Sequence, residues 1–454
     1  MTPDSPSSIL NPPSSIRAEG PPHSPSSILN PQSSIRTGGP PHSPSSILNP
    51  QSSIRTGGPH RVVITGIGIV SPFGRGKEAT LEALRNGRSG IVPISGLDSE
   101  TLNCRIAGQI AAEALEGSTK GHDRFTKLAL LAAEDAMAEA GELGVEPERI
   151  GVLLGTGLGG CETLDDSYRR MYGERGRIPP MAIPSSMYNA ASSAVSTRFG
   201  AKGVSYSVVS ACASSAHAIG LAMTAIRAGQ ADAVLTGGSD APLTLGIIKA
   251  WEALRVLAID NDHPAAACRP FSGDRKGLVL AEGAAVFVLE SYANAQKRGA
   301  TIVAEVLGFG ATSDAGHITD PSADGAARAM KLALADGHLN AGDIHYINAH
   351  GTGTRANDTT ETAAIKAILG DRIPVSSTKS LHGHAMGASG AIEIAASILA
   401  LRDRFLPPTI NLHTPDPACD LDYVPHEARE TSARAFLSNS FGFGGMNAVV
   451  AVRV

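Results

Sequence analysis

Cysteine pairs and aromatic side chains are scarce in this sequence of 454 residues. Aromatic residues make up 4% of the chain, with a single tryptophan. The five cysteines are an odd number, and no two of them have CxxC spacing. Neither a disulfide framework nor a structural zinc site is indicated, and we expect a reducing, cytoplasmic environment.

A strong charge bias and long apolar runs are also missing. The formal net charge is -5 at pH 7, so the chain lacks the basic footprint of a nucleic-acid-binding protein. No apolar run approaches the roughly 18 residues that a membrane-spanning helix requires. The first residues lack the positively charged and then apolar regions of a signal peptide. We therefore expect no nucleic-acid partner, no membrane span and no signal peptide.

Glycine, in contrast, is abundant at 50 residues, within a composition that is 42% hydrophobic and 18% charged. These proportions are ordinary for an α/β protein with a large buried core. The many glycines indicate tight turns and close backbone approaches. From Arg61 onward, expected strands and helices alternate, which predicts α/β layers with largely parallel strands.

The first 60 residues differ from the rest. A 19-residue unit, SPSSILNPQSSIRTGGPPH with small changes, begins at Ser5, Ser24 and Ser43. Each unit carries at least two prolines and few apolar residues, so it cannot bury enough surface to offset its ordering entropy. We predict disorder over residues 1–60, and interpret the segment as an inert extension, the result of a misplaced start codon, or a binding tail.

Two strand–turn–helix units carry the polar residues of greatest interest. In the first, the expected strand 205–210 leads into a helix over 213–228. In the second, the run PVSSTKSLHGH leads into a helix over 387–402. The shared plan indicates two duplicated sub-domains. Another helix is expected to begin at the N-cap Asp123 and to end at Gly141.

Cys212 stands between the strand and the helix of the first unit, in SACASSAHAIG. A sulfur at that position meets the free N–H groups and the positive end of the helix. Such sites stabilise a thiolate and lower the cysteine pKa, to somewhere in ~3.5–7.5. We interpret Cys212 as a nucleophile, with a small buried core cysteine as the alternative.

Two histidines lie at glycine-flanked strand ends, His350 in NAHGTGT and His384 in STKSLHGHAMGASG. Proteins of the α/β class place their ligands at such loops, although a lone histidine is more often structural. Lys379 and Glu393 accompany His384. Glu393 falls on a largely apolar helix face, where its carboxylate could pair with Lys379 or orient His384.

Two glycine-rich loops have simpler interpretations on spacing alone. FGFGG (441–445) turns around Phe443 and fits a plain hairpin. GTGLGG (155–160) follows a strand and fits GxGxxG, but the acidic residue expected roughly 20 residues further on is not evident. A dinucleotide site is therefore not predicted.

Four motifs, in this order, resemble those of the β-ketoacyl-[acyl-carrier-protein] synthase II family: SACASSAHAIG, NAHGTGT, STKSLHGHAMGASGAIE and NSFGFGGMN. The similarity covers Arg61 to Val454, and LGIIKAWEALRVLA resembles the nodulation-factor branch, whose members make specialised acyl chains. The family implies an α/β thiolase fold, five-layered αβαβα, built from two similar halves. We place these halves at 61–305, with the nucleophile, and 306–454, with the catalytic histidines.

The resemblance also assigns roles to residues. Cys212 is implied to receive the acyl group, with His350 and His384 as catalytic histidines and Lys379 and Glu393 as their supporting pair. The other implied roles are a gating ring and substrate contacts: Phe443 as the gate, Phe441 in the same mobile loop, Thr352 and Thr354 at the pantetheine arm, Cys161 at the acyl tunnel, and Met446 at the loop end or malonyl site.

The implied activity is decarboxylative Claisen condensation of an acyl thioester on Cys212 with malonyl-[acyl-carrier-protein]. The products are β-ketoacyl-[acyl-carrier-protein] and CO2, in fatty-acid or polyketide-type chain elongation. No metal or redox cofactor is implied, because the 4'-phosphopantetheine belongs to the acyl carrier protein. The sequences HGTGT and GGMN depart from the commoner HGTST and GGTN, which leaves the chain-length preference open.

The expected partners are an acyl carrier protein and a second copy of the chain in a homodimer. The alternative is a partner or scaffold subunit, resembling a chain-length factor, in a heterodimeric ketosynthase. That role is typical of chains that lack the nucleophile, whereas Cys212 is present. Carrier proteins of this type are acidic, so Lys120, Arg124 and Lys127 are candidates for a basic docking patch, with a solvated helix face as the alternative.

Overall fold

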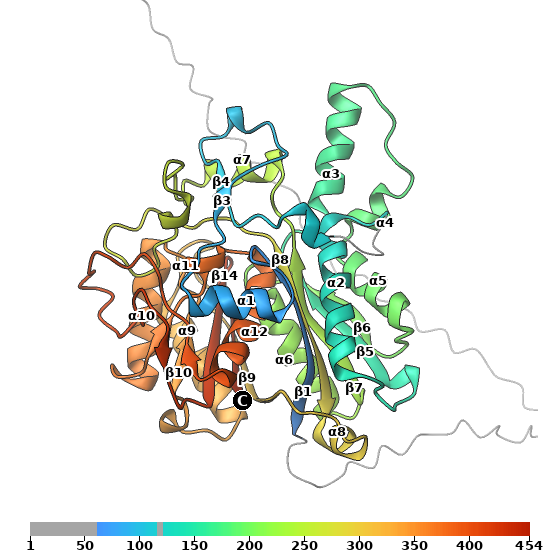
Figure 1. Cartoon of the computed structure of the whole chain (residues 1–454), viewed down its shortest axis with the longest axis vertical. Helices are drawn as coiled ribbons and strands as arrows, with labels where there is room; N and C mark the ends of the chain where they lie inside the picture. The colour runs from blue at the N-terminus through green and yellow to red at the C-terminus, as the bar shows by residue number, and fades with distance from the viewer. Residues whose placement is uncertain (1–60, 116–120) are drawn as a thin grey trace, which may run out of the picture. The chain divides into compact units, whose positions relative to one another are not determined.

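The computed structural model describes residues 61–115 and 121–454 (Figure 1). The 19-residue repeats, for which the sequence predicts disorder, lie outside the described residues, and so does Lys120. Within the described ranges, no helix combines the length and the apolar character needed to cross a membrane.

Most strands belong to one large mixed sheet. Its order is β11 (Val375–Ser376), β10 (Tyr346–Asn348), β14 (Ala435–Gly442), β15 (Met446–Arg453), β9 (Ala304–Ser313), β1 (Val62–Ser71), β8 (Gly283–Ser291), β7 (Ala233–Asp240), β5 (Ile150–Gly155) and β6 (Ser205–Val208). A short strand, β2 (Gly74–Arg75), pairs with β1. Two small sheets pair β3 (Val92–Pro93) with β4 (Ile106–Ala107), and β12 (Phe405–Leu406) with β13 (Arg429–Glu430).

The sheet has two halves that meet where β1 pairs with β9, from Val62 opposite Val306 to Ile64 opposite Ala304. The prediction of largely parallel strands is wrong. β5 runs parallel to β6 and β7, and β10 runs parallel to β11 and β14, but β8 and β15 are antiparallel to their neighbours. Antiparallel strands need no crossover helix, and β14 and β15 are joined by a short turn.

Five layers result from the way helices cover the two halves. α6 (Ser214–Arg227) and α12 (Ser389–Arg402) lie in the middle, because each contacts strands of both halves. One outer layer is α2 (Arg124–Ala140) with α5 (Ala190–Phe199), and the other is α9 (Ala323–Asp336) with α10 (Arg355–Leu369) (Figure 1). The predicted αβαβα fold class is thus confirmed.

The sequence of each central or outer helix fits its layer. α12, in the middle, is buried almost all round, as SGAIEIAASILALR permits. α2, in an outer layer, begins as predicted at Asp123, whose side chain accepts a hydrogen bond from the Phe125 N–H, and its C-cap is Gly141. Glycine lets β1 approach α2 closely, because a Cβ at Gly68 would lie 1.8 Å from the Ala132 carbonyl oxygen.

The remaining helices are short, and one of them, α7, borders the pocket described below. They are α1 (Lys77–Arg85), α3 (Cys161–Tyr168), α4 (Ala182–Ser186), α7 (Leu245–Ala253), α8 (Tyr292–Lys297) and α11 (Lys379–His382).

Candidate active site

Cys212 lies in a tight turn between β6 and α6, one residue before the N-cap Ala213. Ala211 has a φ of 51°, in the left-handed region that L-residues seldom adopt. The turn is braced by the Ser214 hydroxyl, which donates to the Ala211 carbonyl at 2.6 Å and accepts from the Ser210 N–H at 2.9 Å. This bracing aims the Cys212 side chain toward the C-terminal half.

The two predicted histidines meet Cys212 from that half. The Cys212 Sγ lies 3.2 Å from His384 Nε2, and His384 Nδ1 lies 2.8 Å from the Ser389 hydroxyl. The His350 and His384 rings are 5.4 Å apart and nearly perpendicular. Cys212 therefore forms one cluster with two histidines that lie more than 130 positions further along the chain, as the motifs predict.

Burial sets the protonation states in this cluster. It raises the pKa of the Cys212 thiol to about 12, against the lowering effect of Lys379. Burial and Lys379 hold the pKa values of His350 and His384 well below the ordinary range. The predicted lowering of the Cys212 pKa is therefore wrong, since desolvation outweighs the helix end. The resting site contains a thiol and two neutral imidazoles.

Lys379 and Glu393 form the predicted pair, fully buried beneath the histidines. The Lys379 ammonium donates to the His350 carbonyl at 2.5 Å and lies 3.3 Å from His350 Nδ1. Burial raises the pKa of Glu393 to about 7, and Lys379 opposes the rise. Because an ammonium only donates, Nδ1 of His350 is the acceptor and the proton resides on Nε2. Lys379 thus hydrogen-bonds to His350, whereas it acts on His384 through its charge.

Two buried carboxylates that hold the active-site loops were not identified from the sequence. Glu361 on α10 accepts the N–H groups of His350 and Gly351, both at 2.8 Å. Asp240, at the end of β7, accepts those of Gly157 and Gly387, both at 2.7 Å. The position of Asp240 at a strand end is a signal that could have found it, whereas nothing in the sequence distinguishes Glu361 from a solvated helix residue.

A pocket opens from the surface to the cluster. Four of the predicted substrate-contacting or gating residues line it together with the cluster: Thr352, Thr354, Phe441 and Phe443. Cys161 and Met446 do not line this pocket. Cys161 is buried at the start of α3, where its thiol contacts the Ala241 carbonyl at 3.1 Å, and Met446 is 39% exposed at the start of β15.

Phe443 has an aromatic partner that the sequence did not suggest. Its ring stacks on Trp251 of α7, with centroids 5.7 Å apart and planes 23° from parallel. Both residues line the pocket, and Phe443 is 37% exposed. Phe443 thus lies at the rim of the pocket with its ring against Trp251.

The structure gives little support to Arg124 and Lys127 as parts of a basic docking patch. Arg124 pairs with the buried carboxylate of Glu282 at 2.6 Å and donates to the Ile110 carbonyl. Its guanidinium is therefore committed to the fold. Lys127 is half-buried on the same helix.

The catalytic cluster is also the group of side chains best placed to bind a metal ion in the described part of the chain. The Cys212, His350 and His384 ligand atoms all lie within 4.8 Å of one another. Cysteine and histidine are the usual ligands of Zn²⁺. An ion there would occupy the thiol and both imidazoles, the same groups that acyl chemistry requires, so we treat the cluster as a site for covalent catalysis.

Two family profiles match this chain. Residues 60–295 match "Beta-ketoacyl synthase, N-terminal domain" and residues 303–413 match "Beta-ketoacyl synthase, C-terminal domain". Nodulation protein E of Rhizobium leguminosarum bv. trifolii is 45% identical over 405 residues, covering 87% of this chain and 99% of that protein. The 3-oxoacyl-[acyl-carrier-protein] synthase 2 of Staphylococcus aureus (strain COL) is 42% identical over 405 residues, covering 86% and 97%.

A solved structure supports the same assignment. It is a type II polyketide synthase acyl-carrier protein in complex with its ketosynthase bound to the hexaketide, and the matching chain is 35% identical with a TM-score of 0.81. The alignment covers 87% of this chain and 99% of that one. With both profiles, the relatives and the Cys–His–His cluster in agreement, the chain belongs to the β-ketoacyl synthase family and is an acyltransferase of the condensing-enzyme type.

Proposed function

We propose that this chain extends an acyl thioester by decarboxylative condensation with malonyl-[acyl-carrier-protein]. The observation that carries the proposal is the position of the Cys212 thiol at the base of a pocket, 3.2 Å from His384 Nε2 and beside the His350 ring. One nucleophile and two neutral imidazoles are the groups that this reaction uses.

The first step transfers the acyl group to the enzyme. The Cys212 thiol gives its proton to His384 Nε2 as the sulfur attacks the thioester carbonyl of the acyl carrier. The proton then passes to the departing pantetheine thiolate, and the acyl group remains on Cys212. The Ser389 hydroxyl assists, because a hydroxyl both donates and accepts and so can partner His384 Nδ1 in either protonation state.

The second step forms the carbon–carbon bond. Loss of CO2 from the malonyl thioester leaves an enolate, whose oxygen needs donors that are already in place. His350 Nε2–H is such a donor, because Lys379 fixes the tautomer from the other side of the ring. His384 is the second donor once Cys212 is acylated, in the tautomer that carries its proton on Nε2 while Nδ1 accepts from the Ser389 hydroxyl. The carbanion attacks the acyl carbonyl, the C–S bond breaks, and the Cys212 thiolate takes up a proton from water.

We propose an acyl carrier protein as the partner that brings both thioesters. The rim of the pocket carries exposed apolar side chains, Leu254 and Ile318, at 50% and 69% exposure. Arg255 is exposed between Leu254 and Val256, which both line the pocket. A positive charge beside an apolar rim suits an acidic carrier, and the Staphylococcus and polyketide relatives, whose names include an acyl carrier protein, support this partner.

We also propose a dimer formed along β6. This strand ends the large sheet, with β5 as its neighbour, so its outer edge carries unpaired backbone groups. Exposed apolar side chains gather in the segments that include α3, α4 and β6: Tyr168, Met171, Tyr172, Ile178, Met181, Ile183, Met187, Tyr188, Tyr206 and Val209. Apolar residues at this density are typical of an interface. A homodimer fits, and a heterodimer with a ketosynthase-like subunit is the alternative.

A purely scaffolding, chain-length-factor-like role is the competing proposal for this chain. Such a subunit needs no nucleophile, yet here the Cys212 thiol, both imidazoles and the Lys379–Glu393 pair are all in contact. Cys161 and Met446 remain our proposed determinants of chain length, Cys161 because it begins α3 beside the proposed dimer surface.

Acylation of Cys212 is the decisive test. We expect incubation with an acyl-[acyl-carrier-protein] to raise the intact mass by one acyl group in the unaltered chain but not in Cys212→Ala. Circular dichroism of the variant checks that its fold is unchanged. A mass increase that persists in Cys212→Ala would remove this residue from its role, and no increase in the unaltered chain would favour the scaffold.

A further inference from the structure

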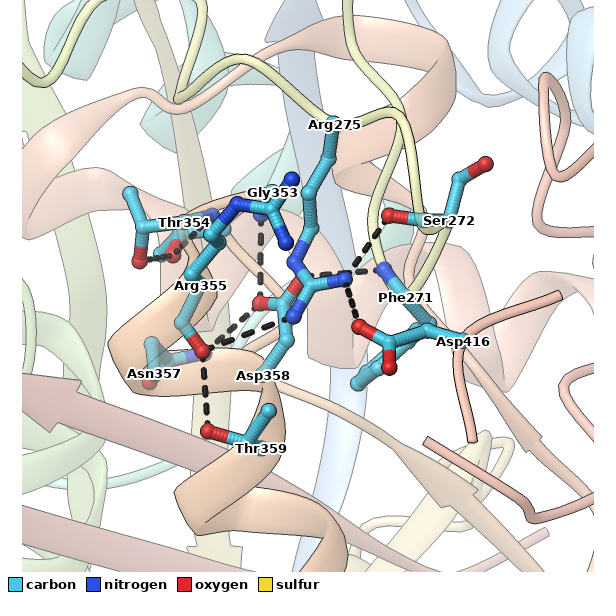
Figure 2. A network of polar contacts seen from close by, with 12 residues as sticks. Phe271, Ser272, Arg275, Gly353, Thr354, Arg355, Asn357, Asp358, Thr359 and Asp416 are labelled. Carbon is cyan, nitrogen blue, oxygen red and sulfur yellow. Dashed lines mark hydrogen bonds and ion pairs between the residues drawn. The ribbon is translucent and has the colours of Figure 1, made fainter. Parts of the chain in front are cut away.

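A second cluster of buried charges lies behind the loop that carries His350. The side chains of Arg275 and Asp358 are 1% and 0% exposed, and their ion pair spans 3.2 Å. Arg275 also pairs with Asp416 at 2.5 Å and donates to the Ser272 carbonyl at 2.7 Å (Figure 2). The three charged residues come from separate segments: the loop before β8, helix α10 and the segment before β13. The two chemical steps described above use none of them.

The Asp358 carboxylate holds backbone on two sides. One oxygen accepts the Gly353 N–H at 3.2 Å, and the other accepts the Phe271 N–H at 2.8 Å. Gly353 has a φ of 81°, and it stands between Thr352 and Thr354, which line the pocket. A side chain is excluded there, since a Cβ would lie 2.8 Å from the Gly277 carbonyl oxygen. The shape of the loop thus depends on Asp358.

Resting on the proposed function, we infer that Arg275 is a positioning residue for decarboxylation. Its ion pair keeps the Asp358 carboxylate in place, and the hydrogen bonds that Asp358 accepts keep the loop from His350 to Thr354 in place. Arg275 touches no reacting atom. Its guanidinium binds Asp358 on one side and Asp416 on the other, so it fastens the loop to two segments at once (Figure 2).

The electrostatics support this role. Burial raises the pKa of Asp358 to about 6, and Arg275 is the charged group that opposes the rise. Without the guanidinium, the carboxylate would take up a proton at a higher pH and lose acceptor strength toward Gly353. The other titratable groups near Asp358 do not replace Arg275, because they are the carboxylate of Glu361 and the thiols of Cys268 and Cys419.

The test compares two half-reactions in the full-length chain. Arg275→Met is assayed for CO2 release from malonyl-[acyl-carrier-protein] and for acylation of Cys212, each at saturating carrier protein. We expect CO2 release to fall by roughly 10–100-fold, as small displacements of catalytic groups do, and acylation to change far less. We also expect the acidic limb of the CO2-release profile to move to higher pH, because the pKa of Asp358 rises.

Arg298→Met is the matched control. Arg298 pairs with Glu290, which is equally buried at 0%, but at the end of β8 next to α8. A purely structural role for Arg275 would make the two variants alike, with equal losses in both half-reactions and no shift of the pH profile, and would overturn the inference. Arg275→Lys, which keeps the charge, should restore part of the CO2 release.

Two further results keep the test decisive. If Arg275→Met does not fold, Asp416→Ala removes only the outer partner of Arg275. A loss confined to CO2 release then supports the inference, whereas equal losses in the two half-reactions overturn it. If the unaltered chain neither acylates Cys212 nor releases CO2, the proposed function fails instead. If it does both and the Arg275 variants behave like it, the inference alone fails.

Discussion

The reactive residue Cys212 shows two opposing effects at one atom. Its position before α6 favours a thiolate, but burial is stronger and raises the pKa of the thiol to about 12. The thiol can still react, because His384 Nε2 lies 3.2 Å away and is neutral at physiological pH. In the proposed mechanism, the thiol proton therefore moves to His384 during the attack, and no thiolate has to exist beforehand.

His350 should be required for condensation but not for acyl transfer. We expect His350→Ala to keep the acylation of Cys212 and to lower the release of CO2 from malonyl-[acyl-carrier-protein] by about 10²–10³, the cost of one lost donor to an oxyanion. Intact mass and CO2 release measure the two steps separately. Normal CO2 release in this variant would contradict the role of its Nε2–H as an enolate donor.

At the scale of elements, short contacts between secondary structures position the site. α7 supplies the ring on which Phe443 rests, β7 ends at Asp240, and α10 carries the carboxylates that hold the His350 loop. Each of these elements is ordinary in sequence. Their function follows from which loops they contact, so it appears only when the chain is folded.

The stack between Phe443 and Trp251 can be followed by fluorescence, because Trp251 is the single tryptophan of the chain. We expect Phe443→Ala to shift the emission to longer wavelength, as the ring loses a contact worth about 0.5–1.5 kcal/mol beyond its buried area. Acylation of the unaltered chain should change the emission, and acylation of the variant should not. Phe199→Ala, at the end of α5, is the control. Spectra that are the same in all three proteins would contradict a gate formed by Phe443.

The N-cap of α2 joins two elements and should matter for stability. Asp123 accepts the Phe125 N–H at 3.1 Å and the Thr163 N–H of α3 at 2.8 Å. We expect Asp123→Ala to lower the free energy of unfolding by about 0.5–2 kcal/mol, read as an earlier midpoint in guanidinium chloride. Ser291→Ala, which removes the cap of α8 alone, should cost less. An unchanged midpoint for Asp123→Ala would show that neither hydrogen bond contributes.

At the scale of the whole molecule, the described fold begins at Arg61, whose guanidinium binds Glu305 and stacks on Tyr292. The boundary between the halves at residue 305 and the cytoplasmic location stay predictions. The expectations for the dimer and for the first 60 residues concern the assembly of the protein.

Deletion of residues 1–60 should change neither the oligomeric state nor the rate of condensation, because the site and the β6 edge lie in residues 61–454. Light scattering and CO2 release measure these two properties. A monomeric or inactive product would show that the repeats contribute to the assembly.

A charge placed on the β6 edge should break the proposed dimer. We expect Tyr206→Asp to be monomeric by analytical ultracentrifugation, since the side chain is 43% exposed on the outermost strand. Leu332→Asp, at a position 47% exposed on α9, is the matched control and should leave the oligomeric state unchanged. Equal behaviour of the two variants would place the interface elsewhere.

The sequence by itself determined the α/β class, the family and the cluster of Cys212, His350 and His384, because these depend on periodicity and on local motifs at strand ends. It also indicated the cap at Asp123, because an aspartate stands directly before a helical pattern of apolar residues, and the Lys379–Glu393 pair, because Glu393 falls on a largely apolar helix face. The four motifs and their order along the chain are enough for these predictions, and no distance between atoms is needed.

Only the tertiary structure decided the rest. Groups far apart in the chain determine the direction of the strands, the pKa of Cys212 and the stacking partner of Phe443. They also form the contacts by which Asp358 and Arg275 position the His350 loop. Burial, which sets the strength of every charge in the site, is a property of the packed molecule. A local pattern cannot report it, because the atoms that exclude water from Cys212 come from both halves.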